Sequence, residues 1–360
     1  MLSELIISQL TFGKLSLLDA KKAFDEKGSA EEALKFLSSH VSADYQSLEK
    51  RAKEEIEWCN NNKVRVVTIS DPDYPQRLKH CCDAPMVLFV RGKADLNAQH
   101  AISIVGTRQC TTYGKDCINK IVDDMAEKCP DVHIVSGLAY GVDITAHRAA
   151  MRNGLPTIGV VAHGQGTLYP AHHRNEANKM VLGNGAVITE FFHDVFPEAR
   201  NFLQRNRIIA GMSDATLIPE SAIHGGGMVT ARLAIDYNRE LFAIPGSITS
   251  PMSEGPNALI RDNKAMLVTS AGDIVKSLGW HTEEKLQQAR KKGIERELFT
   301  DFTDDERKVV EALQKGDQTK DTLCVETGLP ISTLSTAIFT LEMKGIIRAL
   351  SGSQYHLING

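Results

Sequence analysis

Two stretches of the sequence place a glycine and polar residues directly after a run of β-branched residues. Ile102–Val105 is followed by Gly106-Thr107-Arg108, and Val132–Val135 is followed by Ser136–Gly141. Backbone N–H groups near a helix start bind phosphate, and an arginine adds bidentate hydrogen bonds to it. Because ligands of open parallel sheets bind beyond the carboxyl ends of the strands, we expect both turns to line one phosphate site.

A nucleotide cofactor is a weaker interpretation of these turns. Their glycines lack the G-x-G-x-x-G spacing of dinucleotide-binding loops, and no acidic residue ends the next predicted strand. Asp143 and His147 lie four residues apart and share a helix face, but as metal ligands they lack a third partner. We therefore expect an internal hydrogen bond or a charge at the helix start for this pair, and we predict no cofactor and no metal site.

A basic run that also carries amides and an aromatic ring forms a second candidate. Arginines contact phosphates, whereas amides and aromatic rings contact bases, so the mixture suits a nucleic acid strand whose bases are free to stack. A solvated helix face with Phe202 in the core is an equally open alternative. The residues concerned are Arg200, Asn201, Phe202, Arg205, Asn206 and Arg207.

A third glycine-rich turn precedes a predicted helix at residues 230–238. Its backbone donors can hold another phosphate, or its glycines can permit tight packing of helix against strand. No nucleophile–base pair, HExxH or P-loop motif is recognisable, so we predict that these turns hold phosphates rather than break bonds. The turn consists of Gly225, Gly226 and Gly227. The loop histidines expected at the surface are His163, His172 and His173.

The composition is that of a globular protein without a uniformly basic surface. Lys and Arg number 41 against 45 Asp and Glu, a formal net charge of −4 that still permits a local basic patch. Seven cysteines form no C-x-x-C pair, so neither a zinc site nor a disulfide framework is expected. Residues 1–10 lack a basic n-region, and no run approaches the roughly 20 apolar residues of a membrane span. We therefore expect a cytosolic protein.

The elements that must position these residues fall into four segments. Residues 1–62 have apolar helical spacing and predict a small helical domain of SAM or helix-hairpin-helix type, or a packing module without a ligand. Residues 63–280 alternate strand and helix patterns and predict a doubly wound α/β domain. Residues 281–302 form a charged linker, and residues 303–360 predict three helices and a β-hairpin, the outline of a winged helix. The expected strands of the α/β domain are 64–69, 86–91, 102–105, 132–135, 157–162, 187–190, 215–219 and 241–245.

Five motifs occur in an order that matches a known family. They are Val105-Gly-Thr-Arg, Ser136-Gly-Leu-Ala-Tyr-Gly-Val-Asp-Ile-Thr-Ala-His, Arg205-Asn-Arg-Ile-Ile-Ala-Gly-Met-Ser, Gly226-Gly-Met-Val-Thr-Ala-Arg and Gly255-Pro-Asn-Ala-Leu-Ile. On these motifs the chain resembles the bacterial DNA-processing protein A family, also called DprA or Smf. The first motif has Thr107 where the family commonly has serine, a change that keeps the hydroxyl group.

The resemblance implies an extended Rossmann-like fold that binds single-stranded DNA, loads the RecA recombinase and protects incoming strands during natural transformation. It also implies a homodimer formed through the α/β domain. By motif, Arg108 corresponds to a phosphate-contacting arginine, and Arg200–Arg207 to a second cluster of DNA contacts. The glycines that would shape the DNA pocket are Gly137, Gly141 and Gly225–Gly227. The resemblance assigns no role to the helical N-terminal domain or to the winged helix.

Two other classes of function remain open. A nucleotide-hydrolysing Rossmann-like enzyme acting on nucleoside monophosphates uses a Pro-Gly-Gly loop with a nearby glutamate, which Pro219-Glu220 and Gly225–Gly227 do not reproduce. A transcription regulator would place its winged helix on duplex DNA, but the wing has little basic character beyond Arg348. A single-strand-binding protein without catalytic residues is therefore favoured.

Overall fold

The computed structural model describes residues 1–280, 302–314, 316, 318–343, 346–350 and 354–357. The chain divides into two compact units, Met1–Trp280 and His281–Gly360. Apart from its last position, the predicted charged linker 281–302 lies outside the described residues.

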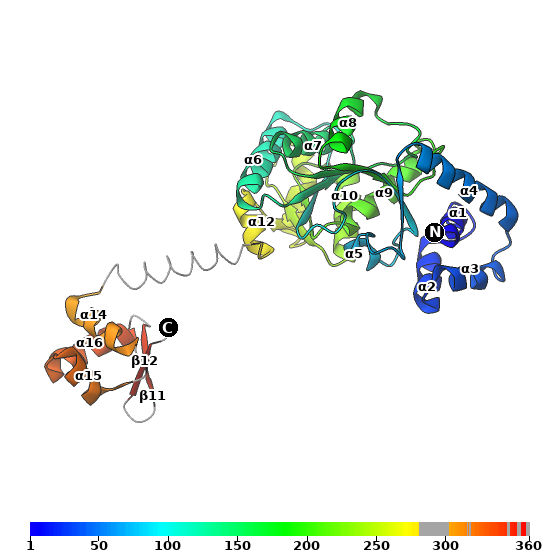
Figure 1. The fold of residues 1–360 in the computed structure, drawn as a ribbon. Coiled ribbons are helices and arrows are strands. Elements are labelled where there is room, and N and C mark those ends of the chain that lie inside the picture. The colour runs from blue at the N-terminus through cyan, green and yellow to red at the C-terminus, as the bar shows by residue number, and fades with distance from the viewer. Residues whose placement is uncertain (281–301, 315, 317, 344–345, 351–353, 358–360) are drawn as a thin grey trace. The chain divides into compact units, whose positions relative to one another are not determined.

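A nine-stranded mixed sheet forms the centre of the first unit (Figure 1). Its strand order is β1-β2-β6-β5-β4-β3-β7-β8-β9. The seven strands β6-β5-β4-β3-β7-β8-β9 are parallel to one another. At one edge of the sheet, β2 pairs with β6 in antiparallel fashion, and β1 pairs with β2 in the same way. The predicted Rossmann-like sheet is confirmed, because β5-β4-β3-β7-β8-β9 has the doubly wound order with the first strand at its centre. The strands are β1 Arg65–Thr68, β2 Val87–Gly92, β3 Ala101–Ile104, β4 His133–Ser136, β5 Thr157–Val160, β6 Ala186–Thr189, β7 Ala215–Ile218, β8 Glu240–Ala243 and β9 Met266–Leu267.

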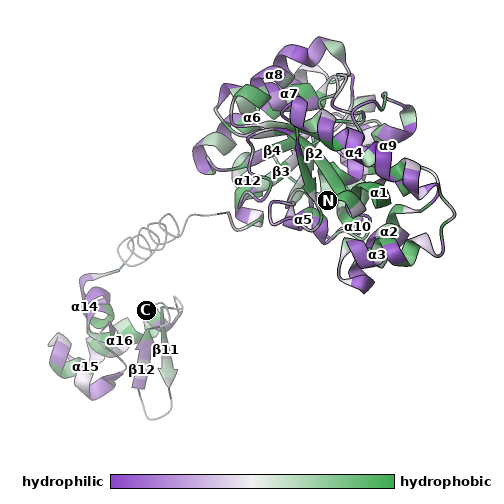
Figure 2. Cartoon of the chain, turned by 45° about the vertical axis from the view of Figure 1, so that its right-hand side comes forward, coloured by the Kyte–Doolittle hydropathy of each residue, from purple (hydrophilic) through white to green (hydrophobic). Residues whose placement is uncertain are grey.

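Helices cover both faces of this sheet. α6, α7 and α12 pack together on one face with α8 beside α7, and α9 and α10 pack together on the other face. Ile134 of β4 lies in the core under the first group and Val135 in the core under the second, because successive side chains of a strand point to opposite faces. Figure 2 shows the hydrophobic strands enclosed by helices with hydrophilic outer surfaces. The helices are α5 Gln76–Lys79, α6 Thr112–Lys128, α7 Val142–Arg152, α8 Arg174–Leu182, α9 Ala199–Gly211, α10 Gly226–Asp236, α11 Glu254–Arg261 and α12 Ala271–Ser277.

Four helices precede the sheet and share its core. The hydroxyl of Ser29 accepts a hydrogen bond from the backbone of Glu32 and caps α3. Leu5 of α1 belongs to the same apolar cluster as Leu88 of β2. The helices therefore bury their apolar faces against the sheet, and whether they fold as a separate domain stays a prediction. They are α1 Leu2–Leu10, α2 Leu17–Lys27, α3 Ala30–Ser38 and α4 Tyr45–Asn61.

The second unit has the predicted winged-helix outline. Its three helices surround a core that includes Leu323, Leu334 and Leu341. Beside them lies a three-stranded antiparallel sheet in the order β10-β12-β11; β10 was not expected from the sequence, and the turn of the expected hairpin, 351–353, lies outside the described residues. The elements are α14 Asp304–Leu313, β10 Gln318–Thr319, α15 Lys320–Thr327, α16 Ile331–Met343, β11 Ile347–Leu350 and β12 Gln354–Leu357.

Hydropathy gives little sign of a membrane span in the part of the chain that the structure describes. No single helix there is long and apolar enough to cross a membrane. One pair, Lys320–Thr327 with Ile331–Glu342, reaches the length and composition only when taken together, and it is bent by 112°.

Candidate functional site

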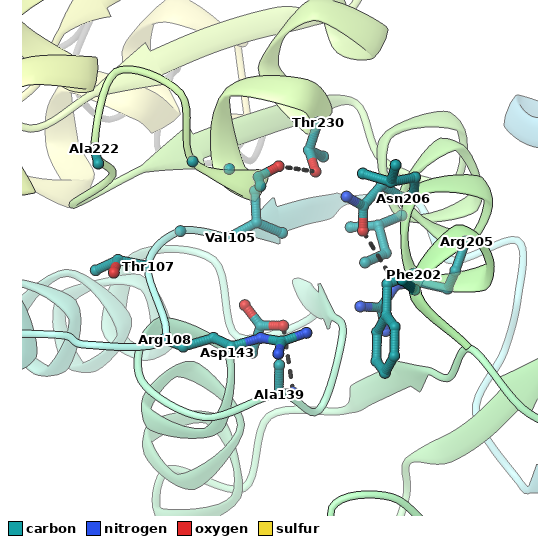
Figure 3. A pocket seen from close by; sticks show the side chains of 17 residues that line it. Val105, Thr107, Arg108, Ala139, Asp143, Phe202, Arg205, Asn206, Ala222 and Thr230 are labelled. Atoms are coloured by element: carbon teal, nitrogen blue, oxygen red, sulfur yellow. Dashed lines mark hydrogen bonds between the residues drawn. The ribbon is translucent and has the colours of Figure 1, made fainter. Parts of the chain in front are cut away.

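The largest convergence of predicted site residues is a pocket of about 630 Å³ beyond the carboxyl ends of β3 and β7 (Figure 3). The chain leaves β3 toward β4 on one side and leaves β7 toward β8 on the other, so the pocket lies at the switch point of the sheet. Open α/β sheets bind their ligands at this place. The pocket is lined by Val105, Gly106, Thr107, Arg108, Ala139, Asp143, Ala199, Phe202, Leu203, Arg205, Asn206, Ile209, Ala222, Gly225, Gly226, Gly227 and Thr230.

The turn after β3 is held by backbone hydrogen bonds to two neighbouring segments. The N–H of Thr107 donates to the carbonyl of Glu220 at 2.8 Å, and the carbonyl of Thr107 accepts from Val142 at 3.1 Å. A Cβ on Gly106 would lie 2.3 Å from the Glu220 carbonyl oxygen, so only glycine permits this approach. The turn thus presents Arg108 from a fixed backbone.

Gly141 is required by the same turn for two reasons. Its φ of 76° is left-handed, and a Cβ would lie 2.2 Å from the carbonyl oxygen of Thr107. Gly141 is also the N-cap of α7, so the glycine lets the start of that helix touch the β3 turn. Its role in the structure is to fit two backbones together rather than to line the pocket wall.

The amino end of α10 supplies further donors to the pocket. Gly225 is its N-cap, and Gly226 and Gly227 are its first two residues. The N–H groups of the first turn of a helix have no acceptor within the helix and carry a partial positive charge. A Cβ on Gly227 would lie 2.9 Å from the Cα of Gly106, whereas a Cβ on Gly226 would meet no atom within 4 Å. Gly227 thus permits tight packing, and Gly226 leaves the helix end open.

Two guanidinium groups lie over one aromatic ring at the pocket wall. The Cζ of Arg108 is 5.1 Å from the centroid of the Phe202 ring, and the Cζ of Arg205 is 5.8 Å from it. Arg108 is exposed, and no carboxylate in the described part of the chain forms an ion pair with it. Such cation–π contacts hold an arginine in place while leaving its N–H groups available. Arg108 is therefore the accessible cation of the pocket.

Arg205 is buried and holds the ends of two strands together. Its Nη1 donates to the carbonyl of Gly137 at 2.7 Å and to the carbonyl of Val160, and its Nε donates to Asn206. Burial lowers the pKa of its guanidinium to about 10, the neighbouring Asp143 opposes that change, and Arg108 adds to it. Arg205 stays charged at neutral pH and adds to the positive field of the pocket without an exposed guanidinium.

Asp143 lies beside Arg205 at the pocket floor. Burial raises the pKa of its carboxyl, and the charge of Arg205 and the N–H of Ala139 oppose that rise. A Cβ on Gly137 would lie 2.6 Å from the carboxylate and 2.7 Å from the Arg205 Cζ, so this glycine makes room for both groups. The expectation that Asp143 and His147 form internal hydrogen bonds is confirmed, since His147 bonds to Leu138 N and to Thr157 Oγ1.

The structure brings some predicted site residues into the pocket and leaves others outside its lining. Inside are Gly106, Thr107, Arg108, Phe202, Arg205, Asn206, Gly225, Gly226 and Gly227, and Gly137 lines a small hollow that continues from it. Five predicted site residues line neither the pocket nor the hollow: Ser136, Gly141, Arg200, Asn201 and Arg207.

The residues outside the lining have other partners. The buried Ser136 hydroxyl donates to the carbonyl of Ile104, and Asn201 donates to that of Phe196. Arg200 is exposed and pairs with Glu198 at 3.1 Å. Arg207 is buried and forms an ion pair with Glu190, which is equally buried.

The helix carrying this basic run matches neither sequence interpretation in full. Phe202 is only half-buried and lines the pocket, so it is not in the core. Four residues of the run are almost fully buried and do not form a solvated face: Asn201, Arg205, Asn206 and Arg207.

The surface positions expected for two loop histidines are wrong. His163 is 1% exposed and His173 is 3% exposed. His163 accepts a hydrogen bond from the N–H of Tyr169 through Nε2, and Nδ1 of His173 lies 2.8 Å from the carbonyl oxygen of Leu138. Both rings satisfy loop backbone groups, which is why polar residues are buried there. His172 is exposed, as expected.

Two tyrosines beside the pocket were missed as site residues. Tyr169 stacks edge-on against Phe202 at 5.8 Å between ring centroids, and Tyr140 lies in the same hollow, with its hydroxyl 3.1 Å from His172 Nδ1. Both rings are more than two-fifths exposed. Tyr140 lies within the second glycine motif, but no local pattern around Tyr169 points to the pocket, because its neighbours there are distant in sequence.

The fold and the pocket define a Rossmann-type protein with a pocket at the switch point of its sheet. The chain belongs to the DNA recombination-mediator protein A family, whose profile matches residues 65–279. The profile of the DprA winged helix domain matches residues 296–353.

Relatives and solved structures agree with this assignment. The chain is 34% identical to Protein Smf of Escherichia coli K12 over 311 residues, 83% of this chain and 79% of that protein. It is 36% identical to DNA processing protein DprA of Streptococcus pneumoniae R6 over 212 residues, 58% of this chain and 72% of that protein. The X-ray structure of DNA processing protein A from S. pneumoniae has a TM-score of 0.58 at 30% identity and covers 76% of this chain and 92% of that one. A structure that concerns the single-stranded DNA binding mode of the Helicobacter pylori protein has a TM-score of 0.53 at 28% identity and covers 59% of this chain and 95% of that one.

Proposed function

We propose that this protein binds single-stranded DNA at the switch-point pocket and has no catalytic role of its own. The observation that carries the proposal is the environment of Arg108. This exposed arginine has no carboxylate partner among the described residues and lies over the ring of Phe202. The amino end of α10 borders the same pocket. A phosphate can accept hydrogen bonds from the guanidinium and from the helix N–H groups together. The H. pylori relative, solved for its single-stranded DNA binding mode, supports this assignment.

The aromatic residues favour a single strand over a duplex. Phe202, Tyr169 and Tyr140 lie along one side of the pocket and its adjoining hollow. Bases stack on such rings only when they are not paired in a duplex, and each stacked base contributes about 1–3 kcal/mol. We infer that phosphates bind near Arg108 while neighbouring bases lie toward the aromatic residues.

The decisive experiment replaces Arg108 with alanine and measures oligonucleotide binding by fluorescence anisotropy at several salt concentrations. Loss of a charge-assisted hydrogen bond, worth about 1.5–3 kcal/mol, should weaken binding about 10- to 150-fold. The weakening should be alike for all base sequences, and the salt slope should fall by about 0.7 for one lost phosphate contact. Arg65→Ala, an exposed arginine on the edge strand β1, is the matched control. Equal affinity of the Arg108 variant and the control would refute the assignment.

Hydrolysis of nucleoside monophosphates is the competing function, and Glu220 is the carboxylate it would need. Glu220 is 1% exposed, and its oxygens accept hydrogen bonds from the N–H and the hydroxyl of Thr111 at 2.8 and 2.5 Å. A carboxylate used in this way is poorly placed to activate water. Release of free base from a nucleoside monophosphate by the pure protein, lost in Glu220→Gln, would favour the enzyme instead.

Family membership suggests the RecA recombinase as the protein partner. The proposed cellular role is to protect incoming DNA strands during transformation, and the proposed location is the cytosol. The test is the lag before RecA filaments form on single-stranded DNA. Added protein should shorten that lag, and Arg108→Ala should not. An unchanged lag with the wild-type protein, under conditions in which it binds DNA, would separate DNA binding from recombinase loading.

A homodimer through the Rossmann-like domain is the second proposed partnership. β9 is the last strand of the sheet order, so its outer edge offers unpaired backbone groups. Three apolar side chains near this edge are exposed: Met266 (48%), Leu267 (45%) and Ile248 (92%). Two of them, Leu267 and Ile248, line one shallow groove. Apolar groups beside an open strand edge suit a second copy of the same surface.

Light scattering after size exclusion tests this interface. Leu267→Glu should convert the dimer to a monomer. Leu182→Glu, which changes an 82% exposed leucine at the end of α8, should leave the mass unchanged. A monomeric wild type, or a dimer that survives the Leu267 variant, would remove β9 as the interface.

A further inference from the structure

A cluster of potential metal ligands lies at the opposite edge of the sheet from the DNA pocket. It consists of His100, directly before β3, Cys129, the C-cap of α6, and Asp131, just before β4. β3 and β4 are parallel, so their amino ends lie together at this edge. One ligand atom from each of the three side chains lies within 4.8 Å of the other two.

The two sulfur distances within the cluster are close to those of a tetrahedral zinc site. Cys129 Sγ is 3.5 Å from His100 Nδ1 and 3.3 Å from one carboxylate oxygen of Asp131. His100 Nδ1 is 2.8 Å from the other oxygen. With zinc–ligand bonds of about 2.0–2.3 Å, tetrahedral ligand atoms lie roughly 3.3–3.6 Å apart. The two oxygen distances belong to different oxygens of Asp131, so this exposed carboxylate must rotate to bring one oxygen to ligand distance from both Sγ and Nδ1.

The protein holds two of the three side chains in place. The His100 ring packs against the Trp280 ring at 4.9 Å, and the His100 carbonyl accepts from His133 N at 2.9 Å. Cys129 is 3% exposed, and its backbone bonds to Met125 and Val132. Preorganised ligands bind a metal with little loss of conformational freedom. Asp131 borders solvent and provides the entry side.

The chemistry of the three side chains suits a cation. A carboxylate, an imidazole and a thiol that can lose its proton form a donor set that zinc accepts, with water in the fourth position.

We propose that His100 Nδ1, Cys129 Sγ and Asp131 bind one Zn²⁺ ion together with a water molecule. On binding, the Cys129 thiol releases its proton to solvent, a sulfur–zinc bond forms, and no oxidant or reductant is needed. The ion would join the starts of β3 and β4 to the end of α6. The sequence gives no hint of this site, because His100 lies 29 residues before Cys129 and no C-x-x-C pair is present.

The test uses the full chain after removal of metal by a chelator. Titration with zinc against a chromophoric chelator should give one ion per chain. Co²⁺ in place of zinc should give the intense visible bands of a tetrahedral ion and a near-ultraviolet thiolate-to-cobalt band. Asp131→Asn, at a side chain that is 54% exposed and so safe for folding, should weaken zinc binding at least about tenfold, as even loss of an outer hydrogen-bond partner does.

Two further variants make the result specific. Cys129→Ser should abolish the thiolate-to-cobalt band, whereas Cys82→Ser, at an exposed cysteine outside the cluster, should keep it. Single-stranded DNA affinity should stay unchanged in Asp131→Asn, because the pocket lies at the other edge of the sheet. Absence of stoichiometric zinc, octahedral cobalt without a thiolate band, or equal zinc affinity in Asp131→Asn would each overturn the proposal.

Discussion

Three arginines within eight residues of α9 have three different environments. Arg200 is exposed beside Glu198, Arg205 is buried against the carbonyls of Gly137 and Val160, and Arg207 forms a buried ion pair. A basic run in the sequence is therefore not a count of phosphate contacts. The same arginine chemistry serves solvent, strand ends and a core carboxylate, depending on which side of the helix carries it.

Arg207→Gln should destabilise the protein and leave the DNA affinity of the folded fraction unchanged. Removing one partner of a buried ion pair costs about 3–5 kcal/mol, because the other charge is left uncompensated. Urea unfolding measures the loss. The double variant Arg207→Met with Glu190→Leu should recover most of the lost stability, because it removes both buried charges. It also removes two polar atoms that have no hydrogen bond in the folded protein, Glu190 Oε1 and Arg207 Nη1. A Gln variant as stable as the wild type would contradict the prediction.

The buried His147 should make the protein less stable in acid. Burial, with the charges of His173 and Arg205, lowers its pKa to about 3, and Nε2 accepts from Leu138 N while Nδ1 faces the Thr157 hydroxyl. The His147 ring takes up a proton near pH 6.5 in the unfolded chain and near pH 3 in the folded chain. The stability that the neutral ring contributes to the fold is therefore complete above about pH 6.5 and is lost as the pH falls toward 3.

The predicted slope is about 1.4 kcal/mol per pH unit for this group. It is measured as the free energy of unfolding in urea between pH 7 and 4. His147→Gln should flatten the profile, whereas His172→Gln, at an exposed ring, should not. An equal slope in both variants would show that other groups dominate acid unfolding.

At the scale of elements, α10 approaches the β3 turn closely where Gly227 lies against Gly106. Gly227→Ala places a Cβ 2.9 Å from the Cα of Gly106, so backbone must shift, and we expect a loss of about 1–3 kcal/mol in stability together with weaker DNA binding. Gly226→Ala meets no atom within 4 Å and should keep or raise stability by about 0.4–1 kcal/mol. Urea unfolding of the two variants side by side makes the comparison. If both gain stability equally, helix propensity rather than packing controls the effect of these substitutions.

The strands and helices were largely predictable because local patterns specify them. Buried parallel strands give continuous apolar runs, and caps such as Ser29 mark helix starts. The edge strands β9 and β10 were missed, since two residues carry no periodic signal. The burial of Arg205 and Arg207 was not predictable either, because their partners come from β4, β5 and the end of β6, which the sequence does not place beside α9. Arg108 was predictable because motif and strand end coincide.

At the scale of the molecule, the first unit should suffice for DNA binding. All residues that line the pocket lie between 105 and 230, and the compact unit ends at Trp280. A chain of residues 1–280 should fold cooperatively and keep its affinity for single-stranded DNA within about threefold, a difference of ~0.7 kcal/mol. Anisotropy on both chains provides the comparison. A much weaker short chain would assign part of the binding to the winged-helix unit.

The pairing of β3 with β7 has a consequence for how the protein is made. Ser103 of β3 bonds to Thr216 of β7 across 113 residues of sequence. At roughly 5–20 residues per second, a ribosome needs roughly 6–23 s to deliver the second strand after the first. Until then the β7-side edge of β3 stays open, and half the pocket is missing. Contacts this distant in sequence form slowly, so DNA binding becomes possible only late in synthesis, and the nascent chain depends on protection of that edge in the interval.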